Sequence, residues 1–528
     1  MSANGFDAVV IGGGANGLVA ATRLAKAGAR TLLIEGGEAL GGQSRTVEFA
    51  PGFFAAPLGL DPGWLPDSIA SGLGLGKFER VNGDVGITVA IEPGSFLSLS
   101  RNASQAAQAI AVHSQSDASK WPSFTKQLRA LAGFLETLYQ KPAPDVNATS
   151  PGEIVSMLDL GRAYRGLGKR NMIEFLRTLP LSVGELADDW FECAPLKAAI
   201  ASVGIRDHRQ GPRSGGTGFV LLHHLVGAPA GSIQGRIPNR AGPAAFTQAA
   251  EHAAQRAGVT IRTGIPVSRI HMKDHTVTGV LLGNGEEVAA RTVLSTASAA
   301  ATLLEAVDPV WLDPEFLHAV RNIRHRGCTA FVLYALDALP EFPGLDSTNA
   351  LAGTVSLTPS LTALEKAADS AKYGTVSDHP HVELSVPTLL WPDQAPQGKH
   401  VLVARVQYAP YQLRGGNVWN AARRDLLADR VTATIESVAP AFRSHIQHRV
   451  AWSPMDLEER FGLLEGAPSH GELGLDQILF MRPIAGWSRY TTPIEGLYLG
   501  GAGTHPGPGI LGLPGWLAAQ RVLADRRK

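Results

Sequence analysis

The stretch from Asp7 to Glu35, DAVVIGGGANGLVAATRLAKAGARTLLIE, decides the fold. It opens with the apolar run Ala8–Ile11, which is typical of a strand buried on both faces. A turn with three glycines, Gly12, Gly14 and Gly17, follows. After it come an Ala- and Leu-rich helical segment and a second apolar run, Thr31–Ile34. The order of strand, glycine turn, helix, strand and terminal acid predicts a dinucleotide-binding unit.

Each of these residues has a mechanical role in such a unit. Gly12 allows the tight turn out of the strand, Gly14 lets the backbone approach a pyrophosphate, and Gly17 lets the helix pack close to the strand. The helix then directs its free N–H groups and positive dipole end at the pyrophosphate. Glu35, 18 positions after Gly17, can accept hydrogen bonds from both ribose hydroxyls and would repel a 2′-phosphate, which favours FAD or NAD over NADP.

Composition limits the other possibilities. With 528 residues, 45% of them hydrophobic, the chain can form a large core and two or more domains. Lys plus Arg equals Asp plus Glu at 47 each, so no global charge attracts nucleic acid. Cys193 and Cys328 are too few for a disulfide framework or thiolate metal site, and His223-His224 lacks a third ligand at metal-binding spacing. No apolar run has the length of a membrane span and no signal peptide is recognisable, so we expect a cytoplasmic protein without a metal.

A second glycine pair, Gly41-Gly42, follows the acid and precedes Ser44 and Arg45. It suits a loop that passes close to a cofactor, with Arg45 donating to a phosphate; the alternative is a solvated surface arginine. The pattern E-x5-GG-x2-R after GxGxxG resembles the FAD-binding amine oxidase and phytoene desaturase superfamily. The resemblance implies FAD as the cofactor.

Two further segments resemble the phytoene-dehydrogenase-like branch, which includes the type 2 pyridine nucleotide-disulfide oxidoreductase domain-containing proteins. They are PGFFAAPLGLDP at 51–62, which in relatives runs beside the flavin ring, and 453–483, with its ERFGL, HGEL and LDQ pieces. The resemblance also implies that Val267 meets the adenine end through its backbone. This chain has NRAG at 239–242 where the family usually carries GGMG, so we expect no glycine-specific contact there.

The C-terminus repeats the pattern of strand, glycine loop and helix. Residues 496–499 predict a short strand, GGAGTHPGPGILGLPG forms the loop, and 516–524 predict a helix. This element suits a flavin, because the loop can contact the ribityl–phosphate stretch and the helix N-terminus can stabilise negative charge on the reduced ring. Gly503 and Thr504 stand where many superfamily members carry an acid. His505 is our candidate proton acceptor, and the alternative is a histidine that only shapes the loop.

Pattern and resemblance together predict one set of cofactor contacts. Its members are Gly12, Gly14, Ala15, Asn16, Gly17, Glu35, Gly36, Gly41, Gly42, Ser44, Arg45, Leu60, Val267, Gly503, Thr504, Ile510 and Leu511.

The predicted fold class is α/β. A Rossmann-like FAD-binding domain, with a parallel sheet and a β-meander, is interleaved with an α+β substrate domain. We expect the FAD-binding domain at 1–76, 237–305 and 451–528, and the substrate domain at 77–236, largely helical, and 306–450. Within these, Asp207 to Gly218 is glycine-rich and predicts a mobile connection. Leu351 to Pro380 predicts an irregular flap or partner surface.

The first functional hypothesis is an FAD-dependent dehydrogenase or desaturase. It would transfer a hydride from a C–C unit of an apolar substrate, for example a polyene or a cyclic compound, to flavin N5. The alternatives are a flavin amine oxidase acting on a C–N bond, and a non-redox isomerase or binding protein of the same fold. Family members imply oxygen or a quinone as electron acceptor, and carotenoid-handling relatives imply peripheral membrane contact. No nucleic acid partner is expected.

Overall fold

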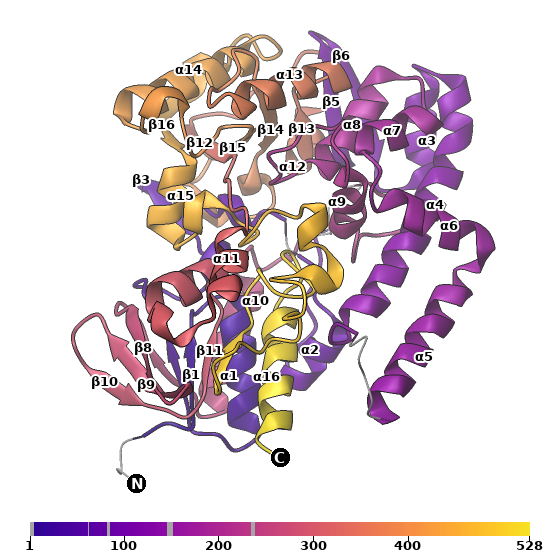
Figure 1. The fold of residues 1–528 in the computed structure, drawn as a ribbon. Coiled ribbons are helices and arrows are strands. Elements are labelled where there is room, and N and C mark those ends of the chain that lie inside the picture. The colour runs from indigo at the N-terminus through magenta and orange to yellow at the C-terminus, as the bar shows by residue number, and fades with distance from the viewer. Residues whose placement is uncertain (1–4, 62, 82–84, 145–150, 234–237, 528) are drawn as a thin grey trace.

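A five-stranded parallel sheet brings together both ends of the chain. The computed structural model describes all residues except 1–4, 62, 82–84, 145–150, 234–237 and 528. The sheet has the order β17-β11-β1-β2-β7, from β1 (Ala8–Ile11), β2 (Thr31–Ile34), β7 (Thr260–Arg262), β11 (Val293–Ser295) and β17 (Leu497–Leu499). In Figure 1 it lies in the lower half, near both termini. The N-terminal and C-terminal units therefore fold together, as predicted.

The side chains of this sheet alternate between two cores. Val10 and Leu33 face helices, which are α1 (Ala15–Lys26), α2 (Asp67–Leu73), α10 (Ala245–Arg256) and α16 (Leu513–Asp525). Val9 and Leu32 face an antiparallel meander with the order β10-β9-β8, formed by β8 (Val267–Lys273), β9 (Thr276–Leu282) and β10 (Glu287–Ala289). A short hairpin, β3 (Val47–Ala50) with β4 (Phe53–Ala55), lies outside this sheet. The predicted α/β class and β-meander are confirmed.

A seven-stranded sheet forms the upper half of the molecule (Figure 1). Its order is β16-β12-β15-β14-β13-β5-β6, and only the β13–β5 pair is parallel. The strands are β5 (Val85–Glu92), β6 (Ser95–Ser100), β12 (Thr329–Leu336), β13 (Thr354–Ser356), β14 (His381–Ser385), β15 (His400–Gln407) and β16 (Ile446–Trp452). Further helices lie along this part of the chain: α11 (Pro314–Arg321), α12 (Ser347–Ala352), α13 (Leu361–Lys372), α14 (Ala421–Glu436) and α15 (Pro454–Phe461).

Our expectation of an irregular segment at 351–380 was wrong. β13 extends the sheet there, and α13 buries Leu361 and Leu364. Its N-terminus is capped by Ser360, whose hydroxyl accepts the N–H of Ala363 at 3.2 Å.

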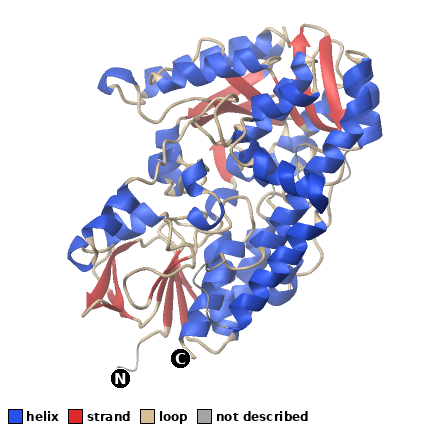
Figure 2. Ribbon diagram, turned by 45° about the vertical axis from the view of Figure 1, so that its right-hand side comes forward, coloured by secondary structure: helices blue, strands red, loops and turns tan. Residues whose placement is uncertain are grey.

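A layer of helices runs along one side of both sheets (Figure 2). It consists of α3 (Ala103–Ala111), α4 (Gln115–Tyr139), α5 (Pro151–Gly166), α6 (Gly168–Thr178), α7 (Val183–Trp190), α8 (Ala194–Gly204) and α9 (Thr217–His224). None of the helices in the described part of the chain is long and apolar enough to cross a bilayer. The domain boundaries that we inferred stay a prediction.

Candidate active site

Two glycine-rich loops meet at the N-terminus of α1. A Cβ on Gly17 would lie 1.8 Å from the carbonyl oxygen of Gly12, so only glycine permits this packing of helix on strand. Gly12 has a φ of +100°, which favours glycine for a second reason. From the second pair, a Cβ on Gly42 would lie 3.2 Å from Gly14 Cα. The two loops thus form a bare backbone surface beside the helix end, of the kind that a pyrophosphate needs.

Glu35 connects these loops at the end of β2. Its carboxylate accepts the N–H of Gly13 at 2.6 Å and that of Gly37 at 2.8 Å. A carboxylate has further lone pairs, so it can still accept ribose hydroxyls. A Cβ on Gly36 would lie 3.3 Å from Pro266 Cβ, which places the start of β8, and hence Val267, beside this turn.

The N-termini of α1 and α16 lie against each other. A Cβ on Gly515 would lie 2.0 Å from the carbonyl oxygen of Asn16. Neither helix has a side-chain cap, because glycines, Gly14 and Gly512, occupy both N-cap positions. The buried Oδ1 of Asn16 has no hydrogen-bond partner among the described residues. Two uncapped helix ends that lie against each other fit the phosphates of a dinucleotide such as FAD, whereas the Asn16 oxygen is an acceptor and needs a hydroxyl or N–H donor.

The C-terminal loop is also joined to the segment that follows the glycine pair. The N–H of Trp64 donates to the Gly509 carbonyl at 2.8 Å, and the N–H of Leu511 donates to the Trp64 carbonyl at 2.7 Å. Ile510 pairs with Trp64 in this short parallel bridge. Trp64 therefore lies beside the predicted contacts Ile510 and Leu511, and Leu60 lines the same pocket as Gly509.

Other predicted contacts are engaged within the protein. Arg45 donates to the Arg460 carbonyl at 2.6 Å and stacks over the Phe461 ring, with 5.3 Å from guanidinium to centroid. Thr504 donates to the Gly501 carbonyl at 2.8 Å. A Cβ on Gly503 would lie 2.9 Å from the His470 carbonyl oxygen. The contacts of Arg45, Ser44, Gly503 and Thr504 with FAD stay predictions.

The structure does not favour His505 as a proton acceptor. The residue is fully buried, and its two ring nitrogens face the carbonyls of Leu479 at 3.4 Å and Lys141 at 3.1 Å. Burial lowers the pKa of His505 to about 4. It is not among the described residues that line the pocket below. These contacts favour our alternative, a histidine that shapes the loop.

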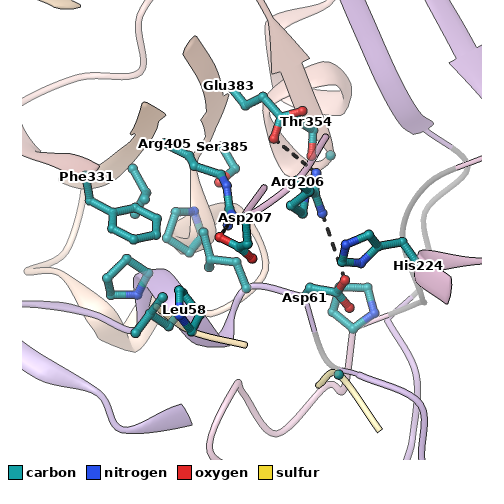
Figure 3. A pocket seen from close by; sticks show the side chains of 18 of the residues that line it. Leu58, Asp61, Arg206, Asp207, His224, Phe331, Thr354, Glu383, Ser385 and Arg405 are labelled. Atoms are coloured by element: carbon teal, nitrogen blue, oxygen red, sulfur yellow. Dashed lines mark hydrogen bonds and ion pairs between the residues drawn. The ribbon is translucent and has the colours of Figure 1, made fainter. Parts of the chain in front are cut away.

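A pocket lies between the predicted cofactor segments and the seven-stranded sheet. It contains about 1440 Å³ of empty space, its open mouth included, which is ample for a small organic molecule. One side is formed by the predicted cofactor segments, through Gln43, Leu60 and Gly509. The opposite side carries sheet residues, among them Phe331, Glu383 and Arg405 (Figure 3). A substrate in this pocket would touch both halves of the molecule.

Two arginine–carboxylate groups line the pocket (Figure 3). Arg206 lies between Glu383, at 3.0 Å, and Asp61, at 3.9 Å. Arg405 pairs with Asp207, which also accepts the hydroxyl of Thr329 at 2.9 Å. Burial raises the pKa of Glu383, but Arg206, His381 and Arg405 together outweigh this effect and the net pKa is lowered. The pocket wall is therefore strongly polar at the sheet and apolar around Leu58, Leu60 and Phe331.

A histidine–carboxylate pair lies at the same wall. His208 lines the pocket, and its Nδ1 is 3.0 Å from Oε1 of Glu472, which is 3% exposed. Arg326 pairs with the other carboxylate oxygen. Burial raises the pKa of Glu472, but His208 and Arg326 outweigh this effect and hold the pKa at about 2.

Sequence reasoning missed these residues. We expected the Asp207–Gly218 segment to be a mobile connection, but in the pocket wall Asp207 is fixed by its ion pair with Arg405 and His208 by its contact with Glu472. The missed signal was the charged run RDHR directly before the glycines, together with the HGEL piece that contains Glu472.

These features define a class of protein: a dinucleotide-binding fold with a pocket beside the predicted cofactor segments. The pattern for NAD(P)-binding Rossmann-like domains matches residues 10–65, and that for flavin containing amine oxidoreductases matches residues 163–522. The chain belongs to the flavin-containing amine oxidoreductase family. It is an oxidoreductase, and its cofactor is FAD, to which the convergent helix ends and Glu35 fit.

Individual relatives agree with this assignment. The chain is 32% identical to pyridine nucleotide-disulfide oxidoreductase domain-containing protein 2 of Rattus norvegicus, over 98% of this chain and 94% of the relative. It is 23% identical to one of the subunits of limonene dehydrogenase from Castellaniella defragrans, over the same shares. The solved structure of putrescine oxidase bound to putrescine superposes with a TM-score of 0.57 at 16% identity, covering 99% of both chains, which shows a shared fold. The resemblance seen in the sequence is thereby confirmed.

Proposed function

We propose that this chain is an FAD-dependent dehydrogenase or desaturase that acts on a C–C unit of a largely apolar substrate. The observation that supports this most is the position of the pocket between the predicted cofactor segments and the seven-stranded sheet. When bound, FAD supplies the two-electron acceptor for a substrate hydride. The chain's own side chains then hold the substrate, exclude water and take up a proton.

The pocket lining modifies the expected substrate. Leu58, Phe331 and Trp391 offer surface to a carbon skeleton, whereas Arg206 and Glu383 offer hydrogen bonds. Burying these charges against a hydrocarbon alone would leave them without solvent compensation. We therefore propose a substrate with an apolar body and at least one hydrogen-bonding group, instead of a pure hydrocarbon.

Amine oxidation is the second candidate. A pair of aromatic rings around the reacting amine would support it. Among the described residues lining the pocket, Phe331 and Trp391 are the aromatic ones, and no ring contact joins them. Arg405 instead lies over the Phe331 ring, 5.7 Å from its centroid. This arrangement supports C–C over C–N chemistry.

The test is an absorbance spectrum of the purified protein, followed by anaerobic addition of phytoene, limonene, a carboxylated terpenoid such as retinoic acid, and putrescine. We expect a yellow flavin band that a terpenoid bleaches and putrescine does not. Reoxidation by air and by a soluble quinone would then identify the electron acceptor. Bleaching by putrescine alone, with hydrogen peroxide after air is admitted, would establish the amine oxidase. A flavin that no compound bleaches would support the non-redox alternative.

We also propose peripheral contact with an anionic membrane. α5 and α6 expose Leu158, Ile173 and Leu176, each more than half accessible. Exposed basic residues accompany them on the same two helices: Arg165, Lys169 and Arg170. Apolar side chains beside cations are typical of helices that lie on anionic lipid.

Vesicle flotation tests this contact. The protein should bind phosphatidylglycerol vesicles and lose that binding in Leu158→Glu/Ile173→Glu. Val112→Glu, at an exposed position away from these helices, is the matched control. Equal flotation of both variants would refute the contact.

A further inference from the structure

We propose that His208 is the catalytic proton acceptor of this pocket, through Nε2, and that Glu472 is its positioning residue. The inference rests on the proposed dehydrogenase function and identifies a group that neither the sequence nor the comparisons assign. It replaces His505, whose ring is enclosed by backbone carbonyls.

The two residues come from distant segments that meet at the pocket wall. His208 follows α8, on the loop that also carries Arg206 and Asp207, whereas Glu472 belongs to the HGEL piece near the C-terminus. Both side chains are about 3% exposed, so the contact between them is held by the surrounding protein. Besides His208 Nδ1, Oε1 of Glu472 accepts the N–H of Arg209 at 2.8 Å, and Arg326 holds the other oxygen. The carboxylate is therefore fixed from three directions.

This fixation decides which nitrogen of His208 is the base. A charged carboxylate can only accept a hydrogen bond, so the Nδ1 at 3.0 Å from Glu472 must carry the proton. The amide nitrogen of Gln210 also lies 3.3 Å from Nδ1, but this longer contact cannot be a hydrogen bond once Nδ1 is protonated. In a neutral ring the lone pair is then on Nε2, and the contacts of the described residues include no hydrogen bond to Nε2. A molecule in the pocket can use it.

The carboxylates of the pocket are weaker candidates. Glu383 is paired with Arg206 and Asp207 with Arg405, and an arginine partner stabilises the charged form of a carboxylate and so lowers its basicity. The charged groups near His208 include Glu472, Arg326, the neighbouring Arg209 and these two pairs. His208 combines a position in the pocket wall with a ring oriented by the buried Glu472; His224 is a second histidine that lines the pocket.

One substrate C–H bond would break, and FAD, when bound, would supply the acceptor for its hydride with both electrons. The C–H bond on the neighbouring carbon breaks with its proton passing to Nε2 of His208, and the electron pair left behind forms the new C=C bond. The imidazolium that results is stabilised by the Glu472 carboxylate on Nδ1.

The first test needs no substrate. Nitrogen-15 NMR of the histidine-labelled holoprotein at pH 7.5, with the His208 signals assigned from the His208→Gln variant, reports which nitrogen is protonated. We expect a neutral ring with the proton on Nδ1, and a loss of this single tautomer in Glu472→Gln. A proton on Nε2, or a doubly protonated ring, would overturn the proposal, because no lone pair would then face the pocket.

The second test uses whichever compound of the panel above bleaches the flavin. With FAD content unchanged, His208→Gln should slow anaerobic flavin reduction by a factor of about 10² to 10⁴. Imidazole added to His208→Ala should restore part of the rate, which a merely structural role would not allow. Glu472→Gln should slow it less.

His505→Gln is the matched comparison. Retained reduction in His208→Gln, or a loss in His505→Gln with FAD bound, would overturn the assignment. If no compound bleaches the flavin, the proposed function fails, and the NMR result still decides the state of His208.

Discussion

Gly515 of α16 lies against the backbone of Asn16 in α1, so that a Cβ would stand 2.0 Å from the Asn16 carbonyl oxygen. The obstructing atom belongs to the backbone and cannot rotate away. We expect Gly515→Ala to force the two helix ends apart and to lower the free energy of unfolding by about 1–3 kcal/mol, as overpacked sites do. FAD retention should fall with it, because both helix ends are displaced.

Thermal unfolding and the ratio of flavin to protein absorbance measure these two effects. Gly133→Ala is the control, because Gly133 lies inside α4 with no atom within 4 Å of the added Cβ. It should be neutral or stabilising by up to about 1 kcal/mol. If Gly515→Ala has the thermal stability and the FAD content of the wild type, the helix contact is dispensable.

Glu35 should be the strongest single determinant of FAD affinity in the N-terminal unit. Glu35→Ala removes the acceptor of two loop amides, Gly13 and Gly37, and the predicted ribose contact at once. We expect FAD affinity to fall by at least about tenfold, in line with the loss of a charge-assisted hydrogen bond. Fluorescence titration of the apoprotein with FAD gives the dissociation constant. Glu38→Gln, at an exposed position three residues on, should bind normally, and normal binding by Glu35→Ala would show that the ribose contact is misassigned.

As the pH is lowered, the protein should begin to lose stability at a higher pH than protonation of its carboxylates alone would cause. Burial lowers the pKa of His381, His470 and His505 from 6.5 to about 4. Between pH 6.5 and 4 these histidines are protonated in the unfolded chain but stay neutral in the folded protein. The free energy of unfolding therefore decreases as the pH falls from 6.5 to 4, and these histidines do not affect it above 6.5. Each histidine contributes up to about 1.4 kcal/mol per pH unit.

Urea unfolding of the holoprotein at pH 7.5, 6 and 5 measures this loss. His505→Gln should make the dependence on pH shallower by up to one proton, whereas His448→Gln, at an exposed position, should leave it unchanged. Equal slopes for His505→Gln and the wild type would contradict a neutral buried histidine.

Removing only Arg206 from its ion pair with Glu383 should lower the free energy of unfolding more than replacing both residues by apolar ones. Arg206→Met leaves the buried Glu383 without its closest cation, and breaking such a pair costs about 3–5 kcal/mol. Adding Glu383→Met removes the uncompensated charge and should recover much of that loss. A double-mutant cycle by urea unfolding measures the coupling. Additive costs for the two substitutions would mean that the side chains do not interact.

The dinucleotide unit could be predicted because its information is local. The spacing of Gly12, Gly14 and Gly17 and the acid at Glu35 lie within one βαβ stretch, and inside it a Cβ on Gly17 would meet the Gly12 carbonyl oxygen at 1.8 Å. The pocket could not be predicted in this way. Arg206 and Asp207, on the loop after α8, are far in sequence from Glu383 and Arg405 of the sheet, and their role follows only from the ion pairs that join this loop to the sheet. Sequence patterns indicate the periodicity of one segment. They do not indicate which distant residues tertiary packing brings together.

β17 and α16 have a consequence for how the protein is made. A nascent chain on the ribosome holds β1, β2 and β11 long before Leu497–Leu499 and the final helix emerge. Until then the sheet has an open edge beside β11, and the helix that meets Asn16 does not yet exist. We therefore expect FAD to be loaded only after β17 and α16 have emerged, and the exposed edge of the sheet to be a site for chaperone binding until then.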